Sequence, residues 1–187
     1  MATISFNDMT PLQELHTLLT TYAAKEKPTS YLEIGVREGN SLLALLDGWK
    51  PQRLCLCDHW GPYAEWPTRT GHEHIAALLA AHNIDAQVTW LDGDSRVLVP
   101  NLKETFDFIT VDGNHARHPA ADDLKAAWPL LNKNGLLFFD DIFHPAHLYL
   151  YDVVLEFLHC HRDDARLERL EKNPPLNLGC SIIRKIK

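Results

Sequence analysis

Short apolar runs alternate with longer segments of helical periodicity along most of the 187-residue chain. The short runs have the length of buried strands, and the longer segments repeat their apolar residues at the spacing of one helix face. Parallel strands need crossover connections, which helices usually provide. The alternation therefore predicts an α/β fold in which a mostly parallel sheet is covered by helices on both faces.

The pattern also places each strand and helix along the chain. No helical segment separates the last two strands, so we expect them to form an antiparallel pair at one edge of the sheet. Strands are predicted at residues 31–35, 53–58, 86–91, 106–112, 135–139, 166–171 and 178–186. Helices are predicted from a capping box at residues 10–13 to Pro28, around residues 42–46, and over residues 72–82, 95–102, 120–131 and 148–161.

Length and charge limit the classes of protein and partner. The length suits one domain, residues 1–187, which we divide into an N-terminal helical extension (1–29) and an α/β core (30–187). Lys and Arg total 18 against 25 Asp and Glu, a net charge of −7, so nucleic acid is not an expected partner. The longest wholly apolar run, residues 75–81, is far shorter than the roughly 20 residues that span a membrane. No signal peptide is visible and the four cysteines fit a reducing compartment, so we expect a cytoplasmic protein without a membrane partner.

The first predicted strand ends in a glycine turn, where α/β sheets bind their ligands. Gly35 and Gly39 flank this turn, and a helix follows it. Asp58 ends the second strand, where a carboxylate suits the two hydroxyls of a ribose. This combination predicts a nucleoside-containing cofactor.

The residues of the turn favour a cationic cofactor over a dinucleotide. A pyrophosphate needs the close backbone approach of Gly-x-Gly-x-x-Gly, whereas Val36, Arg37 and Glu38 separate the two glycines here. Glu33 would also repel a diphosphate. S-adenosylmethionine fits better, because it carries an adenosine, an ammonium and a sulfonium but no phosphate.

Three carboxylates follow two strands that should be neighbours in the sheet. Asp112 ends the fourth strand, and Asp140 and Asp141 end the fifth. The three carboxylates would converge on one rim and repel each other unless a proton or a cation intervened. Oxygen ligands of this kind suit Mg²⁺ or another hard divalent cation. A structural role, with Asp141 capping the next helix, is the alternative.

His115 follows Asp112 in the same loop and is a candidate general base, because an imidazole titrates near neutral pH. The chain has 11 histidines, and three others compete for this role: His118, His144 and His147.

Two of these motifs resemble a known family. The segment Leu32-Glu33-Ile34-Gly35-Val36-Arg37-Glu38-Gly39-Asn40-Ser41 resembles the first motif of class I S-adenosylmethionine-dependent methyltransferases, with Arg37 where many members have a second glycine. Asp112-Gly113-Asn114-His115 and Asp140-Asp141 are similar to motifs of the metal-dependent O-methyltransferases that act on macrolide sugars, and of the cephalosporin hydroxylase-like proteins beside them. The resemblance implies a Rossmann-like, seven-stranded sheet.

The resemblance also implies roles for single residues. It implies a cofactor site composed of Glu33, Gly35, Gly39, Ser41, Asp58, Asp94, Ser95 and Asp112, with Asp94 and Ser95 at the adenine edge. It implies metal ligands at Asp112, Asp140 and Asp141, and catalytic roles for His115 and Asp112.

These observations predict an S-adenosylmethionine-dependent O-methyltransferase that holds a divalent cation. The cation would bind two acceptor oxygens, His115 would remove a proton, and the oxygen would attack the methyl carbon. The acceptor is expected to be a small molecule (a sugar, polyketide or phenol) bound between the first helix, the loop at residues 60–67 and residues 144–151. A homo-oligomer that completes this pocket is one arrangement the sequence allows. The alternatives are a metal-independent N- or carboxyl-methyltransferase, a dinucleotide-dependent oxidoreductase, and a non-catalytic nucleoside-binding methyltransferase-like domain.

Overall fold

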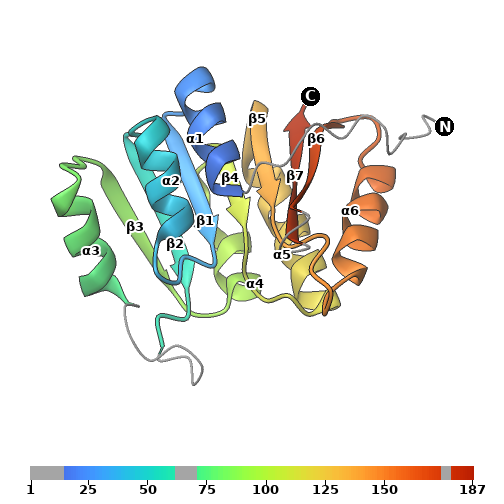
Figure 1. The fold of residues 1–187 in the computed structure, drawn as a ribbon, viewed down its shortest axis with the longest axis horizontal. Helices are drawn as coiled ribbons and strands as arrows, with labels where there is room; N and C mark the ends of the chain where they lie inside the picture. Colours follow the sequence, from blue (N-terminus) through green and yellow to red (C-terminus); the bar gives the residue numbers. More distant parts are fainter. Residues whose placement is uncertain (1–14, 62–70, 174–177) are drawn as a thin grey trace.

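A computed structural model of the protein describes residues 15–61, 71–173 and 178–187 (Figure 1). Its strands are β1 (Ser30–Ile34), β2 (Arg53–Asp58), β3 (Gln87–Asp92), β4 (Phe106–Val111), β5 (Leu131–Phe139), β6 (Ala165–Asn173) and β7 (Leu178–Lys185). Its helices are α1 (Leu15–Glu26), α2 (Asn40–Gly48), α3 (His72–Ala81), α4 (Ser95–Leu98), the 3-10 helix η2 (Val99–Asn101), α5 (Arg117–Leu130) and α6 (Tyr149–Cys160). None of these helices combines the length and the apolar composition that a bilayer crossing requires.

The strands form one sheet in the order β3-β2-β1-β4-β5-β7-β6 (Figure 1). The strands from β3 to β5 in this order run parallel to their neighbours, whereas β7 runs antiparallel to both β5 and β6. The predicted α/β fold and the antiparallel terminal pair are therefore confirmed. Within that pair β7 lies inside the sheet and β6 forms the edge.

Helices cover both faces of the sheet because successive residues of each strand point to opposite faces. Tyr31 packs with apolar side chains of α1, α2 and α3 on one face. Leu32 and Ile34 pack with α5 and α6 on the other face. Cys55 and Cys57 share that second face as buried free thiols, as their spacing predicts. Burying each large apolar side chain contributes roughly 1.5–3 kcal/mol to the stability of these two layers.

Two elements begin three or more residues earlier than predicted. β5 begins at Leu131 rather than at residue 135, and α5 begins at Arg117 rather than at residue 120. The early part of β5 contains polar residues 132–134, its register against β4 shifts, and Asn134 has a φ of 67°, so no strand-like alternation reveals it. The predicted capping box at residues 10–13, most of the loop at residues 60–67, and the prolines at positions 174 and 175 lie outside the described residues.

Close backbone contacts join β1, β2 and β4 at their carboxyl ends. The Asp112 N–H donates to the Ile34 carbonyl (2.8 Å), and the Gly35 N–H donates to the Cys57 carbonyl (2.9 Å). Gly35 has a φ of 88°, and a Cβ atom there would lie only 2.0 Å from the Asp112 carbonyl oxygen. Only glycine fits such a position. Gly35 is thus required by the strand contacts themselves, before any ligand is considered.

We predict that Gly35→Ala lowers the free energy of unfolding by more than about 3 kcal/mol, because the added methyl group must displace backbone and take up a left-handed conformation. Urea denaturation measures this difference. Gly61→Ala is the matched control: among the described residues, the atom nearest to the added Cβ would be the His59 carbonyl oxygen at 3.9 Å, so a change within about 0.5 kcal/mol is expected. Equal stability of the two variants would contradict the account.

Candidate active site

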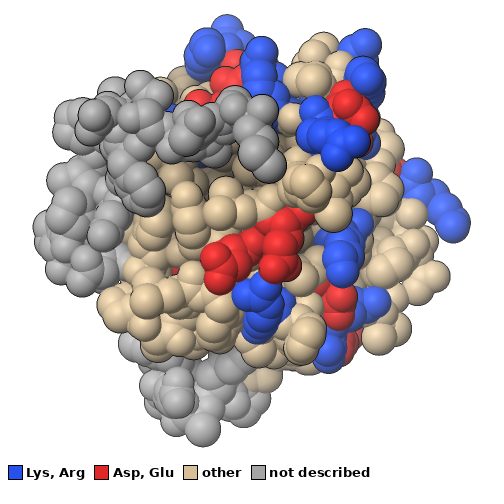
Figure 2. All heavy atoms as spheres, turned by 90° about the vertical axis from the view of Figure 1, so that its right-hand side faces the viewer, with Lys and Arg blue, Asp and Glu red and all other residues tan. Residues whose placement is uncertain are grey.

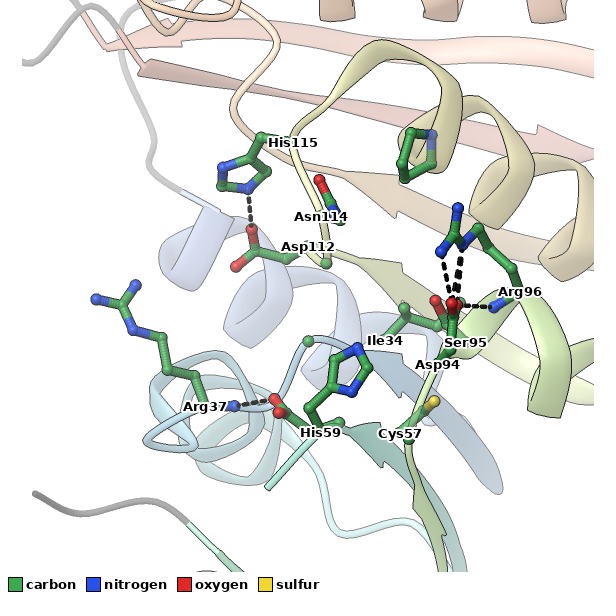
Figure 3. A pocket seen from close by; sticks show the side chains of 15 residues that line it. Ile34, Arg37, Cys57, His59, Asp94, Ser95, Arg96, Asp112, Asn114 and His115 are labelled. Carbon is green, nitrogen blue, oxygen red and sulfur yellow. Dashed lines mark hydrogen bonds and ion pairs between the residues drawn. The ribbon is translucent and has the colours of Figure 1, made fainter. Parts of the chain in front are cut away.

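A cavity of about 340 Å³ opens beyond the carboxyl ends of β1, β2, β3 and β4 (Figure 3). Open α/β sheets bind their ligands at this edge, and the volume is in the range of small-molecule sites. The cavity is lined by Ile34, Gly35, Arg37, Cys57, Asp58, His59, residues 93–96, residues 112–115 and Pro119.

The structure divides the predicted site residues into two groups. Five of the predicted cofactor residues line the cavity: Gly35, Asp58, Asp94, Ser95 and Asp112. His115, the predicted general base, also lines the cavity. The remaining predicted site residues do not: Glu33, Gly39, Ser41, Asp140 and Asp141.

Asp58 connects the cavity to the two loops beside it. Its Oδ2 accepts the Arg37 backbone N–H (2.8 Å), and its Oδ1 accepts the Trp60 backbone N–H (3.0 Å). Arg37 and Trp60 both have left-handed backbones, with φ of 51° and 53°. Asp58 thus holds two strained positions in place. A carboxylate oxygen has two lone pairs and can accept more than one hydrogen bond.

Asp94 and Ser95 begin α4 at the cavity wall. The Asp94 side chain caps this helix by accepting the Arg96 backbone N–H (2.9 Å), and both of its oxygens also accept from the Arg96 guanidinium. These bonds hold the pKa of Asp94 at about 2. Ser95 has a different partner: its hydroxyl donates to Oδ1 of Asp123 on α5 (2.5 Å).

Glu33 is fully buried on β1 and forms a pair with Ser41 of α2. The Ser41 hydroxyl donates to Oε1, whereas Oε2 has no hydrogen-bond partner among the described residues. Burial raises the pKa of Glu33 to about 8, and the nearby carboxylates of Asp112 and Asp58 also raise it. Glu33 is therefore mostly a neutral acid at pH 7 in the absence of a cation.

Asp112, His115 and Asp141 form a compact group beside the cavity. Nε2 of His115 lies 3.2 Å from Oδ1 of Asp112 and 3.5 Å from Oδ2 of Asp141 (Figure 3 shows the first contact). All three side chains are half-buried. Burial raises the pKa of Asp112, and the hydrogen bond with Asp112 raises the pKa of His115. One ligand atom from each residue could reach a shared cation.

This group differs in one member from the three carboxylates that the sequence suggested. Among the described residues Asp140 does not belong to it, and His115 does. Asp141 has a φ of 55°, a strained conformation of the kind that is found at functional sites. The alternative role of Asp141 as a helix cap does not hold, because α6 begins at Tyr149 with Leu148 at its N-cap position.

The segment predicted to border the acceptor reaches this group. The ring of His147 lies 5.3 Å from that of His115, and the ring of His144 stacks on His147 at 4.9 Å. Nδ1 of His147 is 3.0 Å from the Tyr149 hydroxyl. Part of residues 144–151 therefore stands next to this group.

Sequence reasoning missed Asp123. This residue is 1% exposed and lies among the buried side chains of α5, which include Ala120, Leu124 and Ala127. A charged residue within an apolar helical stripe was the available signal, because burying a carboxylate is costly unless it is hydrogen-bonded.

We predict a pH-dependent stabilisation in Glu33→Gln. The folded-state pKa of Glu33, about 8, lies above its unfolded value. Folding is therefore favoured by the bound proton below the unfolded pKa, and this contribution is lost as the pH rises through about 8. Glutamine mimics the protonated acid, so denaturation should find the variant close to the wild type at pH 5 but more stable by a few kcal/mol at pH 9. If the difference in stability between the variant and the wild type is the same at pH 5 and pH 9, Glu33 has an ordinary pKa.

Comparison with known proteins places this site in a family. Residues 32–142 match a family described as a methyltransferase domain. This range covers more than half of the chain and includes the end of β1 and all of β2 to β5, with every residue that lines the cavity. No curated protein matches the chain at a significant level.

Solved structures of methyltransferases share the fold. An O-methyltransferase, TomG from Streptomyces achromogenes, in complex with S-adenosylmethionine, superimposes with a TM-score of 0.73 at 20% identity, over 96% of this chain and 83% of that one. An O-methyltransferase from Bacillus cereus in complex with S-adenosylhomocysteine gives 0.68 at 16% identity, over 97% and 84% of the two chains. The N-methyltransferase NodS from Bradyrhizobium japonicum, also with S-adenosylhomocysteine, gives 0.62 at 14%, over 92% and 86%. The chain belongs to the methyltransferase domain family and has the class I fold of S-adenosylmethionine-dependent methyltransferases.

Proposed function

We propose that this protein is a divalent-metal-dependent O-methyltransferase that transfers a methyl group from S-adenosylmethionine to a hydroxyl of a small molecule. The observation that carries the proposal is the group formed by Asp112, His115 and Asp141 at the edge of the cavity. The same fold serves both O- and N-methyltransferases, so the acceptor chemistry has to be argued from this group.

The cavity fits S-adenosylmethionine in shape and in charge. Gly35 keeps the β1 turn close to the strand ends, and Asp58 lies on the cavity wall, where a carboxylate suits the hydroxyls of a ribose. Glu33 lies on β1 and is buried, and one oxygen of its carboxyl group has no hydrogen-bond partner among the described residues. A cationic ligand nearby would favour the ionised form of Glu33, which burial otherwise disfavours. We propose that Glu33 acts on the methionine end of the cofactor through its charge, since it does not line the cavity wall.

The donor set fits a divalent cation. Two atoms that bind one ion at about 2.1 Å lie about 3.0–3.4 Å apart in octahedral or tetrahedral geometry. The distances from His115 Nε2 to the two carboxylates, 3.2 and 3.5 Å, are close to this range. Two carboxylates and one imidazole suit Mg²⁺ or, because of the nitrogen, Mn²⁺ and other first-row ions.

We propose that His115 is a metal ligand rather than the general base that the sequence suggested. Its Nε2 faces both carboxylates, and one nitrogen cannot bind a cation and accept a proton at the same time. A cation held by these residues would lower the pKa of an acceptor hydroxyl bound to it. Because the side chains of Asp112 and His115 are 29% and 34% exposed, water can reach the group and take the proton.

S-adenosylmethionine supplies the methyl group, which passes to the acceptor oxygen in one displacement with the thioether as leaving group. The protein's main contribution is alignment: the cofactor lies along β1, β2 and β4, and the acceptor lies against residues 112–115 and 141. A small acceptor is favoured over nucleic acid by the net charge of −7. On the face formed by α6 and β6, acidic and basic side chains of the described residues lie next to each other (Figure 2).

The metal assignment is tested by Mn²⁺ titration followed by electron paramagnetic resonance. Wild-type protein should bind Mn²⁺, and His115→Ala and Asp141→Asn should each weaken binding by at least about tenfold, because each removes one ligand. Asp140→Asn is the matched variant at the neighbouring carboxylate. It should weaken binding by no more than about threefold, the effect of a nearby charge alone. If His115→Ala binds Mn²⁺ as well as the wild type and Asp140→Asn does not bind it, the ligands are the three carboxylates that the sequence suggested.

Methyl transfer is tested with a panel of catechols, vicinal sugar diols and hydroxylated polyketides, with mass spectrometry to detect the methylated product. We expect product with Mg²⁺ or Mn²⁺ and a loss of about 100-fold or more after exhaustive chelation, restored by adding the ion back. Turnover that survives chelation would support a metal-independent methyltransferase. If S-adenosylhomocysteine does not bind at all, the domain has no cofactor-dependent function.

A further inference from the structure

Asp123 lies outside the cavity and contacts residues of two of its walls. Its side chain comes from α5 and is almost fully buried, and its Oδ1 accepts the hydroxyl of Ser95, which lines the cavity (Figure 3 shows Ser95). On the other wall, a Cβ atom at Gly113 would lie 3.1 Å from Oδ2 of Asp123. The carboxyl group is therefore packed directly under Gly113 and against Ser95.

The charge state of Asp123 decides which way the Ser95 hydroxyl points. A carboxylate can only accept, so the Ser95 O–H must donate to it and keeps only lone pairs for a ligand. The pKa of Asp123 is raised to about 6, mainly by burial, so the group is ionised above neutral pH. The hydrogen bond from Ser95 and the charge of Arg96 favour the ionised form, and Asp94 and Asp122 oppose it.

Ser95 stands at the end of the cavity where a purine would lie. A ribose at Asp58 places its base between the remaining walls, formed by residues 93–96, Gly113 and Pro119. Ile34, Cys57 and Pro119 supply apolar surface for the faces of a ring there. The other predicted adenine contact, Asp94, already accepts bonds from Arg96 with both oxygens. Ser95 remains, and Asp123, which lies outside the cavity, determines whether its hydroxyl donates or accepts.

We propose that Asp123 sets the hydrogen-bond polarity of Ser95, so that this wall accepts an N–H from the 6-amino group of adenine and disfavours a 6-oxo purine. Asp123 is then a specificity-determining residue that never touches the ligand. The inference rests on the proposed cofactor site. It adds the mechanism by which that site distinguishes an amino group from a carbonyl.

The test compares S-adenosylhomocysteine with S-inosylhomocysteine, which has oxygen in place of the amino group. Their dissociation constants are measured by calorimetry at pH 8, where Asp123 is ionised. Ser95→Ala should weaken the adenosyl ligand by about tenfold and leave the inosyl ligand nearly unchanged, because only the former loses a hydrogen bond. Asp123→Asn can donate to Ser95 and free its hydroxyl to donate to a carbonyl. The preference for the adenosyl ligand should therefore fall by about five- to tenfold, with the inosyl ligand bound more tightly than by the wild type.

Asp122→Asn is the matched control, because it removes the same charge from the adjacent, exposed position of α5. The ratio of its dissociation constants for the adenosyl and inosyl ligands should equal that of the wild type. If Asp123→Asn and Ser95→Ala weaken both ligands by the same factor, the pair is only structural and the inference is overturned. Should Asp123→Asn fail to fold, an unchanged preference in Ser95→Ala overturns it equally. Failure of the wild type to bind either ligand would instead overturn the proposed function on which the inference rests.

Discussion

The backbone contact between Gly35 and Asp112 is the constraint on which the site depends. It draws the ends of β1 and β4 so close that no side chain fits at position 35. The same contact orients the start of the β4–α5 loop, because the Asp112 N–H is bound to the Ile34 carbonyl. Asp58 fixes the second side of the turn through the Arg37 N–H. The cavity is therefore shaped by main-chain hydrogen bonds, and such a site is largely formed before a ligand arrives.

Buried and half-buried acids lie around this cavity, and in our account they favour a cationic ligand. Glu33, Asp112 and Asp123 all have a raised pKa, with burial as the main cause. Each carboxyl serves a different purpose in our account: Glu33 acts on the cationic end of the cofactor, Asp112 belongs to the cation group, and Asp123 orients Ser95. Holding three acids here lowers stability at high pH, and a protein tolerates such a cost where function requires it.

The sequence predicted the fold and part of the cavity wall, because both follow from where strands end. Gly35, Asp58 and Asp112 occupy strand ends, and parallel strands bring these ends to one edge. It suggested both Asp140 and Asp141 as metal ligands, whereas among the described residues only Asp141 lies in the group with Asp112 and His115. The left-handed backbone of Asp141 is not specified by any residue pattern. Asp123 was predicted only to lie in a helix. The helical periodicity also places its carboxylate on the buried face of that helix, which could have marked it as a candidate residue.

The most direct test of the account is a crystal structure grown with S-adenosylhomocysteine and Mn²⁺, with anomalous scattering used to locate the metal. We expect the nucleoside in the cavity with its ribose on Asp58, and an anomalous peak bound by Asp112, His115 and Asp141. A nucleoside bound elsewhere, or a cavity that stays closed to it while the three side chains separate, would contradict the central claim.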